Sequence, residues 1–211
     1  MDLHVRYEWP VHRADCTDYM SFLEVDVVAE DEVSDNPFVV GKFEIDKVHW
    51  SDAENDGQSL VHICDADSAA WLEVYEILTE AGKDGQLRND LKLEDFFVEV
   101  VFIHHFLLHP EIEDRVAVID AAIRATTTDN SVVVTWYDAP HNTRLSDDEF
   151  ADLGFKKISG ASLVFRDNHF RYRFADACPQ GRDVDFEGTQ QRESWVLSHW
   201  DGDQPDRVVD N

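Results

Sequence analysis

The fold of this chain is decided by one apolar stretch near its middle, residues Phe96 to Leu108, with the sequence FFVEVVFIHHFLL. β-Branched and aromatic residues dominate the stretch, and the pair His109-Pro110 ends it. A continuous apolar run of this length, closed by a turn, is typical of a strand buried on both faces of a sheet. We therefore expect the central strand of the protein to lie here.

A helix and a second strand follow this run. Val116, Ile119 and Ile123 recur at helical spacing within residues Arg115 to Thr126, and Ser131 to Tyr137 form a second short apolar run. A strand, a helix and a strand of these lengths make a βαβ unit, whose two strands lie parallel in one sheet. We expect these two strands to be neighbours in the sheet.

Weaker patterns predict the rest of the fold. Further strands are expected at Leu3 to Trp9, Tyr19 to Ala29, Phe38 to Trp50, Ala161 to Phe165 and His169 to Phe174. Helices are expected at Ser68 to Ala81, capped by Asp65 or Asp67, and at Asp147 to Leu153, whereas Ser51 to Ser59 is expected to be a polar loop. The fold class is thus α+β: one domain over residues 1–174, with a mixed, twisted sheet flanked by helices. Residues 175–211 are expected to form an acidic extension, partly disordered, with Trp195, Val196, Leu197 and Trp200 as its anchors.

The charge balance limits the class of partner. The chain has 45 acidic and 18 basic residues, a formal net charge of -27. Direct binding to nucleic acid or to an anionic membrane is disfavoured, because both need basic patches. Two interpretations stay open: an acidic, heavily solvated surface suited to high salt, or a surface that imitates nucleic-acid phosphates and occupies a protein that binds them.

The remaining composition predicts a cytoplasmic protein without a metal site. Cys16, Cys64 and Cys178 are odd in number and lack CxxC spacing, so neither a disulfide framework nor a zinc site is indicated. The first ten residues carry charges at Asp2, Arg6 and Glu8, unlike a signal peptide, and no apolar run is long enough to cross a membrane.

The order strand, turn, helix, strand, loop and short helix, together with two short motifs, resembles the core of the GNAT superfamily of acetyl-CoA-dependent N-acyltransferases. In that family a strand ends in a hydrophobic-x-His-Pro step, which Leu107 to Pro110 match, and a later turn has the sequence Leu-Gly-Phe, which Leu153 to Phe155 match. The resemblance covers about residues 38 to 167. It implies a GNAT-like fold and, for an active member, acetyl-CoA as the cofactor.

The loop after the His-Pro step departs from that family. Active members have an Arg/Gln-x-x-Gly-x-Gly/Ala loop there, whose backbone amides hold the coenzyme pyrophosphate at a helix N-terminus. In this chain the basic residue is replaced by Glu113, and the glycines by Asp114, Val116 and Val118. A carboxylate about 4 Å from a phosphate costs roughly 1 to 4 kcal/mol. The resemblance therefore makes acetyl-CoA binding possible but doubtful. Its candidate contacts are Leu108, Arg115, Val116, Ala117, Val118 and Asn142.

The positions that carry catalysis in the family also differ. The resemblance implies a Tyr four residues before the Gly of Leu-Gly-Phe, where this chain has Phe150, and a Glu on the strand, where it has Leu107. Neither Phe nor Leu transfers a proton. His104 and His105 are the candidate bases, since a neutral imidazole accepts a proton near pH 7. Because neighbouring residues of a strand point to opposite faces, we expect at most one of them to face a cleft.

Three hypotheses follow. The leading one is a GNAT-related protein with a lost or weakened coenzyme site, which acts as a non-catalytic binding module with a protein partner. The alternative is an active N-acetyltransferase that holds acetyl-CoA through Arg115 and the amides of Val116 to Val118, with His104 or His105 as base. Arg115→Glu would abolish its catalysis. The third is a nucleic-acid mimic, which would release its DNA-binding partner as salt is raised.

Overall fold

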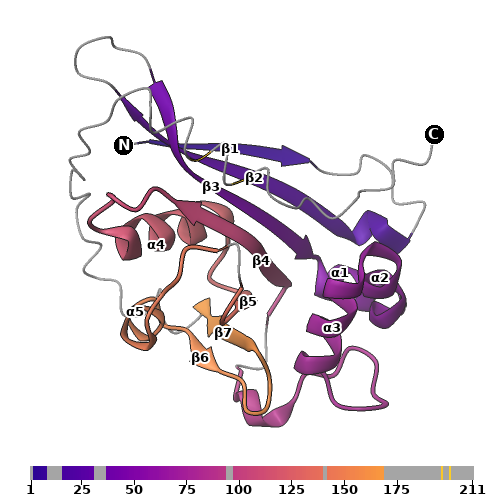
Figure 1. Cartoon of the computed structure of the whole chain (residues 1–211). Helices are drawn as coiled ribbons and strands as arrows, with labels where there is room; N and C mark the ends of the chain where they lie inside the picture. Colours follow the sequence, from indigo (N-terminus) through magenta and orange to yellow (C-terminus); the bar gives the residue numbers. More distant parts are fainter. Residues whose placement is uncertain are drawn as a thin grey trace.

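The computed structural model describes residues 2–8, 16–30, 37–93, 97–139 and 142–168, and the single residues Val196 and Trp200. The described residues form a seven-stranded sheet in the order β1-β2-β3-β4-β5-β7-β6. The strand expected at His169 to Phe174 and the boundary expected between residues 174 and 175 lie outside the described residues. Helices pack on both faces of the sheet (Figure 1). The α+β class and the mixed sheet flanked by helices are therefore confirmed.

The sheet is antiparallel except at its centre. Its first strands are β1 (Asp2–Glu8), β2 (Met20–Glu30), which follows the short helix η1 (Cys16–Tyr19), and β3 (Pro37–Val48). They lead in antiparallel pairs to the central strand β4 (Glu99–Leu108). The only parallel pair among the described strands joins β4 to β5 (Ser131–Trp136), as the βαβ pattern predicts. The sheet ends with β7 (Leu163–Asp167) and the short β6 (Lys156–Lys157), both antiparallel.

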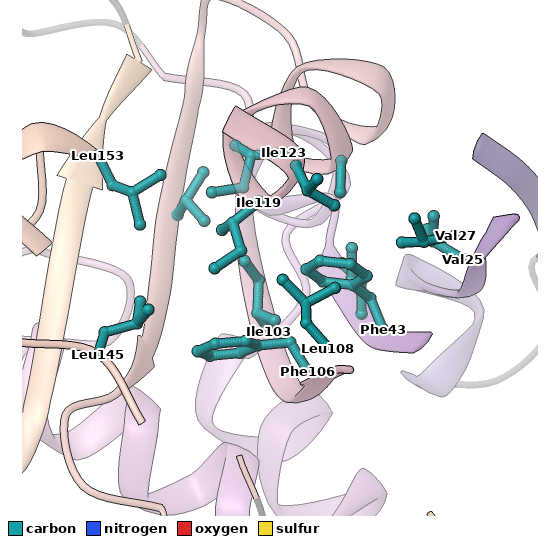
Figure 2. Close-up of a cluster of buried hydrophobic side chains, with 14 of the residues drawn as sticks. Val25, Val27, Phe43, Ile103, Phe106, Leu108, Ile119, Ile123, Leu145 and Leu153 are labelled. Atoms are coloured by element: carbon teal, nitrogen blue, oxygen red, sulfur yellow. The ribbon is translucent and has the colours of Figure 1, made fainter. Parts of the chain in front are cut away.

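One face of the sheet is covered by α4 (Arg115–Thr126) and α5 (Asp147–Asp152). The bounds of α4 are those that the helical spacing predicts, because its buried residues recur three and four apart. Figure 2 shows Ile119 and Ile123 of this helix pointing toward Ile103, Phe106 and Leu108 of β4. The burial of this apolar face holds the crossover helix against the parallel pair.

The other face is covered by three helices, of which sequence patterns predict one. They are α1 (Trp50–Asn55), α2 (Leu60–Asp67) and α3 (Ala69–Leu78), and a short helix η2 (Asn89–Leu91) follows them. Figure 1 shows α1 to α3 grouped beside the end of β3. Their buried side chains pack on Val100 and Phe102 of β4 and on Val132 and Val134 of β5.

Two predictions for this region are wrong. The polar segment Ser51 to Ser59 was expected to be a loop, but its first residues, as far as Asn55, belong to α1. The helix forms there despite the polar composition because Trp50 and Ala53 are buried. The cap of α3 is Ser68, whose side chain accepts a hydrogen bond from the Trp71 amide, rather than Asp65 or Asp67. Asp65 and Asp67 instead lie within α2, since the chain turns directly from one helix into the next at Ser68.

A buried ion pair ties the beginning of β4 to its neighbours. Lys47 Nζ of β3 lies 3.6 Å from Glu99 Oε1 of β4, and both residues are less than a tenth exposed. Ser131 of β5 donates a hydrogen bond of 2.5 Å to the same oxygen. Burial lowers the pKa of Lys47, and the Glu99 carboxylate opposes that shift. Three adjacent strands are thus joined by one polar network in an otherwise apolar layer.

In the described residues, no helix combines the length and the apolar character that a membrane crossing needs.

Candidate functional site

The candidate site begins where β4 and β5 separate. The parallel pairing runs from Glu99 with Ser131 to Ile103 with Thr135, and β4 then continues for five more residues without β5 beside it. The carboxyl ends of adjacent parallel strands are the usual position of ligand sites in α/β sheets. A strand edge without a partner also exposes amide and carbonyl groups that an extended ligand could bind.

A β-bulge at this point changes how the two histidines are presented. Glu44 of β3 is opposite His105, whereas the next residue, Ile45, is opposite Ile103, so His104 is the extra residue of the bulge. His105 therefore faces the same side as Glu44. His104 contacts Asp46, two residues from Glu44 and on that same side. The expectation that the two histidines point to opposite faces is wrong, because the bulge breaks the alternation of the strand.

His104 lies in an aromatic and acidic environment. Its Nε2 atom is 2.6 Å from Asp46 Oδ2, and its ring centroid is 4.0 Å from that of Phe102. Trp71 Nε1 donates a hydrogen bond of 3.3 Å to the same oxygen of Asp46. Within the described residues, His104 Nε2 and the second oxygen of Asp46 are buried and make no hydrogen bond of good geometry. A carboxylate in contact with an imidazole can orient the ring toward a substrate.

The free edge of β4 is closed by the loop after β5. Asn142 Oδ1 accepts a hydrogen bond of 3.1 Å from the Phe106 amide and lies 3.3 Å from His105 Nδ1. Thr143 Oγ1 accepts one of 2.7 Å from the Leu108 amide, and the Thr143 amide donates to the Phe106 carbonyl at 2.8 Å. These two residues replace the missing strand. The candidate coenzyme contacts Leu108 and Asn142 are therefore already engaged with the chain itself.

The N-terminus of α4 is closed by a carboxylate. Asp114 is its N-cap, and Asp114 Oδ1 accepts a hydrogen bond of 3.1 Å from the Ala117 amide. The side chain of Val118 is buried and that of Val116 is partly buried against the core below α4. The amide that would bind an anion at this helix end is thus held by an anion of the same chain.

Arg115 is held by α5. Its Nε and Nη2 atoms donate to the two carboxylate oxygens of Glu149 at 2.5 and 2.9 Å. Glu149 also accepts from the Ser146 amide and hydroxyl in a capping box at the start of α5. The hydrogen bonds from Arg115 and Ser146 lower the pKa of Glu149 to about 2. In the described part of the chain, the polar side-chain contacts of Arg115 are with Glu149 alone.

A small hollow lies between the separated strands. The residues that line it come from β4, the end of β5, the following loop and α5: Phe106, Trp136, Tyr137, Asp138, Ala139, Asn142, Thr143, Arg144, Leu145 and Phe150. Its volume is about 10 Å³, which leaves room for about one water molecule. Phe150 is buried, with its ring centroid 5.4 Å from that of Tyr137. Tyr137 donates its hydroxyl to Asp147.

The structure brings some sequence candidates together and separates others. His105 and Asn142 are in contact, and His104 adjoins them through the bulge. Arg115 and the amides of Val116 to Val118 belong to α4, which covers the opposite face of the sheet. Sequence reasoning missed Asp46, Thr143 and Glu149. Asp46 is one of two acids in the alternating strand β3, and Glu149 is the acid of a Ser-x-x-Glu capping box, but neither pattern identifies the distant partner of its carboxylate. No cluster of three or more His, Cys, Asp or Glu side chains that could hold a metal ion occurs in the described residues.

Comparisons of the chain with protein-family models, with curated proteins and with solved structures find no match.

Proposed function

We propose that this protein is a divergent GNAT-fold protein in which the coenzyme site is lost, and that it acts as a non-catalytic binding module. The fold assignment is supported by the order of strand, His-Pro turn, crossover helix, parallel strand, short helix and Leu-Gly-Phe turn. Helix α5 ends at Asp152, and Gly154, just beyond its C-cap Leu153, has a positive φ of 82°, which glycine adopts without strain.

One observation carries the loss of the coenzyme site: the chain's own side chains occupy the backbone groups that a coenzyme would need. Asp114 holds the Ala117 amide at the anion end of α4, and Asn142 and Thr143 hold the Phe106 and Leu108 amides on the edge of β4. To bind, acetyl-CoA would have to displace all of these groups and approach the carboxylate of Asp114 with its phosphates. The residues present do not fit the coenzyme.

Titration calorimetry with acetyl-CoA tests the proposal. The full chain is titrated at low and at high salt, because a net charge of -27 repels an anionic ligand most strongly at low salt. We expect no saturable heat at either salt. Micromolar binding at either salt would contradict the proposal. The variant Asp114→Asn keeps a capping oxygen but removes the charge, so absence of binding there as well would assign the loss to occupation rather than to charge.

The close contact of His104 with Asp46 favours a second candidate, an active N-acetyltransferase. In this alternative His104 accepts the proton of an amine while Asp46 stabilises the imidazolium, and Arg115 leaves Glu149 to meet the pyrophosphate. Release of free thiol from acetyl-CoA in the presence of a panel of primary amines would support it, provided that His104→Gln abolishes that release and His105→Gln does not. The nucleic-acid-mimic hypothesis stays a prediction.

A further inference from the structure

A second surface lies on the face of the sheet that bears the histidines, on the part of β2, β3 and β4 beyond the end packed by α1 to α3. The register places Asp26, Lys42 and Leu107 side by side across the three strands, and Glu24, Glu44 and His105 in the next row. The side chains of Glu24 and Asp26 are 45% and 37% exposed, so α1 to α3 do not cover this part of the face as they cover the end near Phe102.

Trp200, from the carboxyl-terminal part of the chain, lies against this surface. Lys42 Nζ is 5.8 Å from the centroid of the Trp200 ring, and the His105 ring meets the indole edge to face, with centroids 6.3 Å apart at 86°. Val196, four residues earlier and like Trp200 helical in backbone, is fully buried.

The surface has the chemistry of an indole site. Lys42 offers a cation to the face of the ring, and Asp26, at 3.2 Å, holds the lysine in place. His105 offers its ring to the indole and is itself positioned by Asn142. The bulge at His104 is what turns His105 toward Lys42, since a regular strand would change the facing of every residue after it.

We propose that the surface formed by Lys42, His105 and Leu107 is a recognition site for a tryptophan-bearing peptide segment, and that Trp200 of the same chain holds it in the isolated protein. This inference rests on the proposed function as a binding module, for which it supplies the surface and the class of partner. A segment of the same chain competes at an effective concentration on the order of millimolar. A free peptide of the same chemistry therefore binds measurably only when Trp200 is removed or displaced.

The test uses a fluorescein-labelled peptide with the sequence of residues 192–204, added to full-length protein and followed by fluorescence anisotropy. We expect Trp200→Ala to bind the peptide at least tenfold more tightly than the unaltered chain. Adding Lys42→Glu to Trp200→Ala should abolish binding, whereas adding Lys156→Glu, whose lysine lies over Phe165 on another strand pair, should leave it unchanged. A peptide with alanine at the positions of both Trp195 and Trp200 should not bind.

Equal binding to the unaltered chain and to Trp200→Ala, absence of binding to Trp200→Ala, or binding that survives Lys42→Glu would each overturn the proposal. A second measurement does not depend on removing Trp200. Acrylamide quenching of tryptophan fluorescence should increase in Lys42→Ala and His105→Ala but not in Lys156→Ala, and no increase in the first two would also contradict the proposal. Neither assay contains acetyl-CoA, so coenzyme binding would refute the lost site without deciding the peptide result.

Discussion

The two halves of β4 are built differently. From Glu99 to Ile103 the strand has backbone partners on both edges, antiparallel β3 and parallel β5, and a buried ion pair at its start. From His104 to Leu108 it keeps β3 on one edge, while Asn142 and Thr143 take the other. Backbone pairing on both edges makes the first half a structural core. The second half depends on side-chain hydrogen bonds along one edge, and a single substitution can remove such a bond.

Under the proposed function, this difference explains how a coenzyme site can be lost without loss of the fold. A ligand that binds at the end of a parallel pair needs the free edge that the separating strands leave. Filling that edge from the following loop satisfies the same amides that a ligand would satisfy, at no cost to the paired half. The comparison can be tested by changing one half at a time.

The largest effect is expected in the first half. Glu99→Gln leaves the ammonium of Lys47 buried without a counter-charge, and such a loss typically costs about 3 to 5 kcal/mol of unfolding free energy. Urea denaturation measures it. The control is Glu24→Gln, an exposed carboxylate 2.7 Å from Arg6, which should cost less than about 1 kcal/mol. If the two variants were equally stable, the ion pair would not anchor β4.

The next effect is expected in the second half. Asn142→Ala leaves the Phe106 amide without its acceptor, which should cost about 1 to 3 kcal/mol and speed amide hydrogen exchange at Phe106 about tenfold or more. Asn142→Asp keeps an oxygen at the same place and should retain most of the protection. Unchanged exchange in Asn142→Ala would mean that the side chain does not substitute for a strand.

A smaller, pH-dependent effect is expected where α4 meets α5. The pKa of Glu149 is lowered to about 2 in the folded chain, so its pairing with Arg115 stabilises the fold above about pH 4.5 and this contribution is lost as the pH falls toward 2. Because the Arg115 side chain is 40% exposed, the contribution at pH 7 should be only about 1 to 2 kcal/mol.

The measurement is the difference in unfolding free energy between the unaltered chain and Glu149→Gln, followed from pH 7 to pH 2. Arg115→Met should show the same loss, and the double variant should lose little more than either single one. A difference that does not change with pH would rule out the ionic contribution.

The smallest effect is expected at the cap of α4. Asp114→Ala removes the acceptor of the Ala117 amide and should cost about 1 kcal/mol, while Asp114→Asn should cost only a few tenths. Thermal unfolding monitored by circular dichroism distinguishes the two. Equal stability of the alanine and asparagine variants would show that the capping hydrogen bond does not stabilise the fold.

The paired half of the molecule could be predicted from sequence because its signals are local. The apolar run of β4, the spacing of Ile119 and Ile123 in α4 and the short run of β5 each decide one element, and their order decides the parallel pair. Where apolar residues are few, as in the polar segment after Trp50, burial against the rest of the protein determines that a helix forms. Composition alone predicts a loop there.

The candidate site could not be predicted to the same extent, because its contacts are long-range. Asp46, whose carboxylate contacts His104, is 58 positions earlier in the chain. Asn142, whose side chain accepts from the Phe106 amide, is 36 positions after Phe106. The bulge that turns both histidines to one face depends on the register between β3 and β4, for which neither strand carries a local signal. Of the residues around this edge, His104, His105, Leu108 and Asn142 could be selected in advance, but not their partners.

The closed edge is tested most directly by amide hydrogen exchange at Phe106, Leu108 and Ala117, with and without millimolar acetyl-CoA. Because Asn142, Thr143 and Asp114 already accept from these amides, we predict that all three are protected in the free chain and that their exchange rates change less than twofold with the coenzyme. Unprotected amides in the free chain that slow tenfold or more on addition of acetyl-CoA would contradict the claim that the site is occupied by the chain itself.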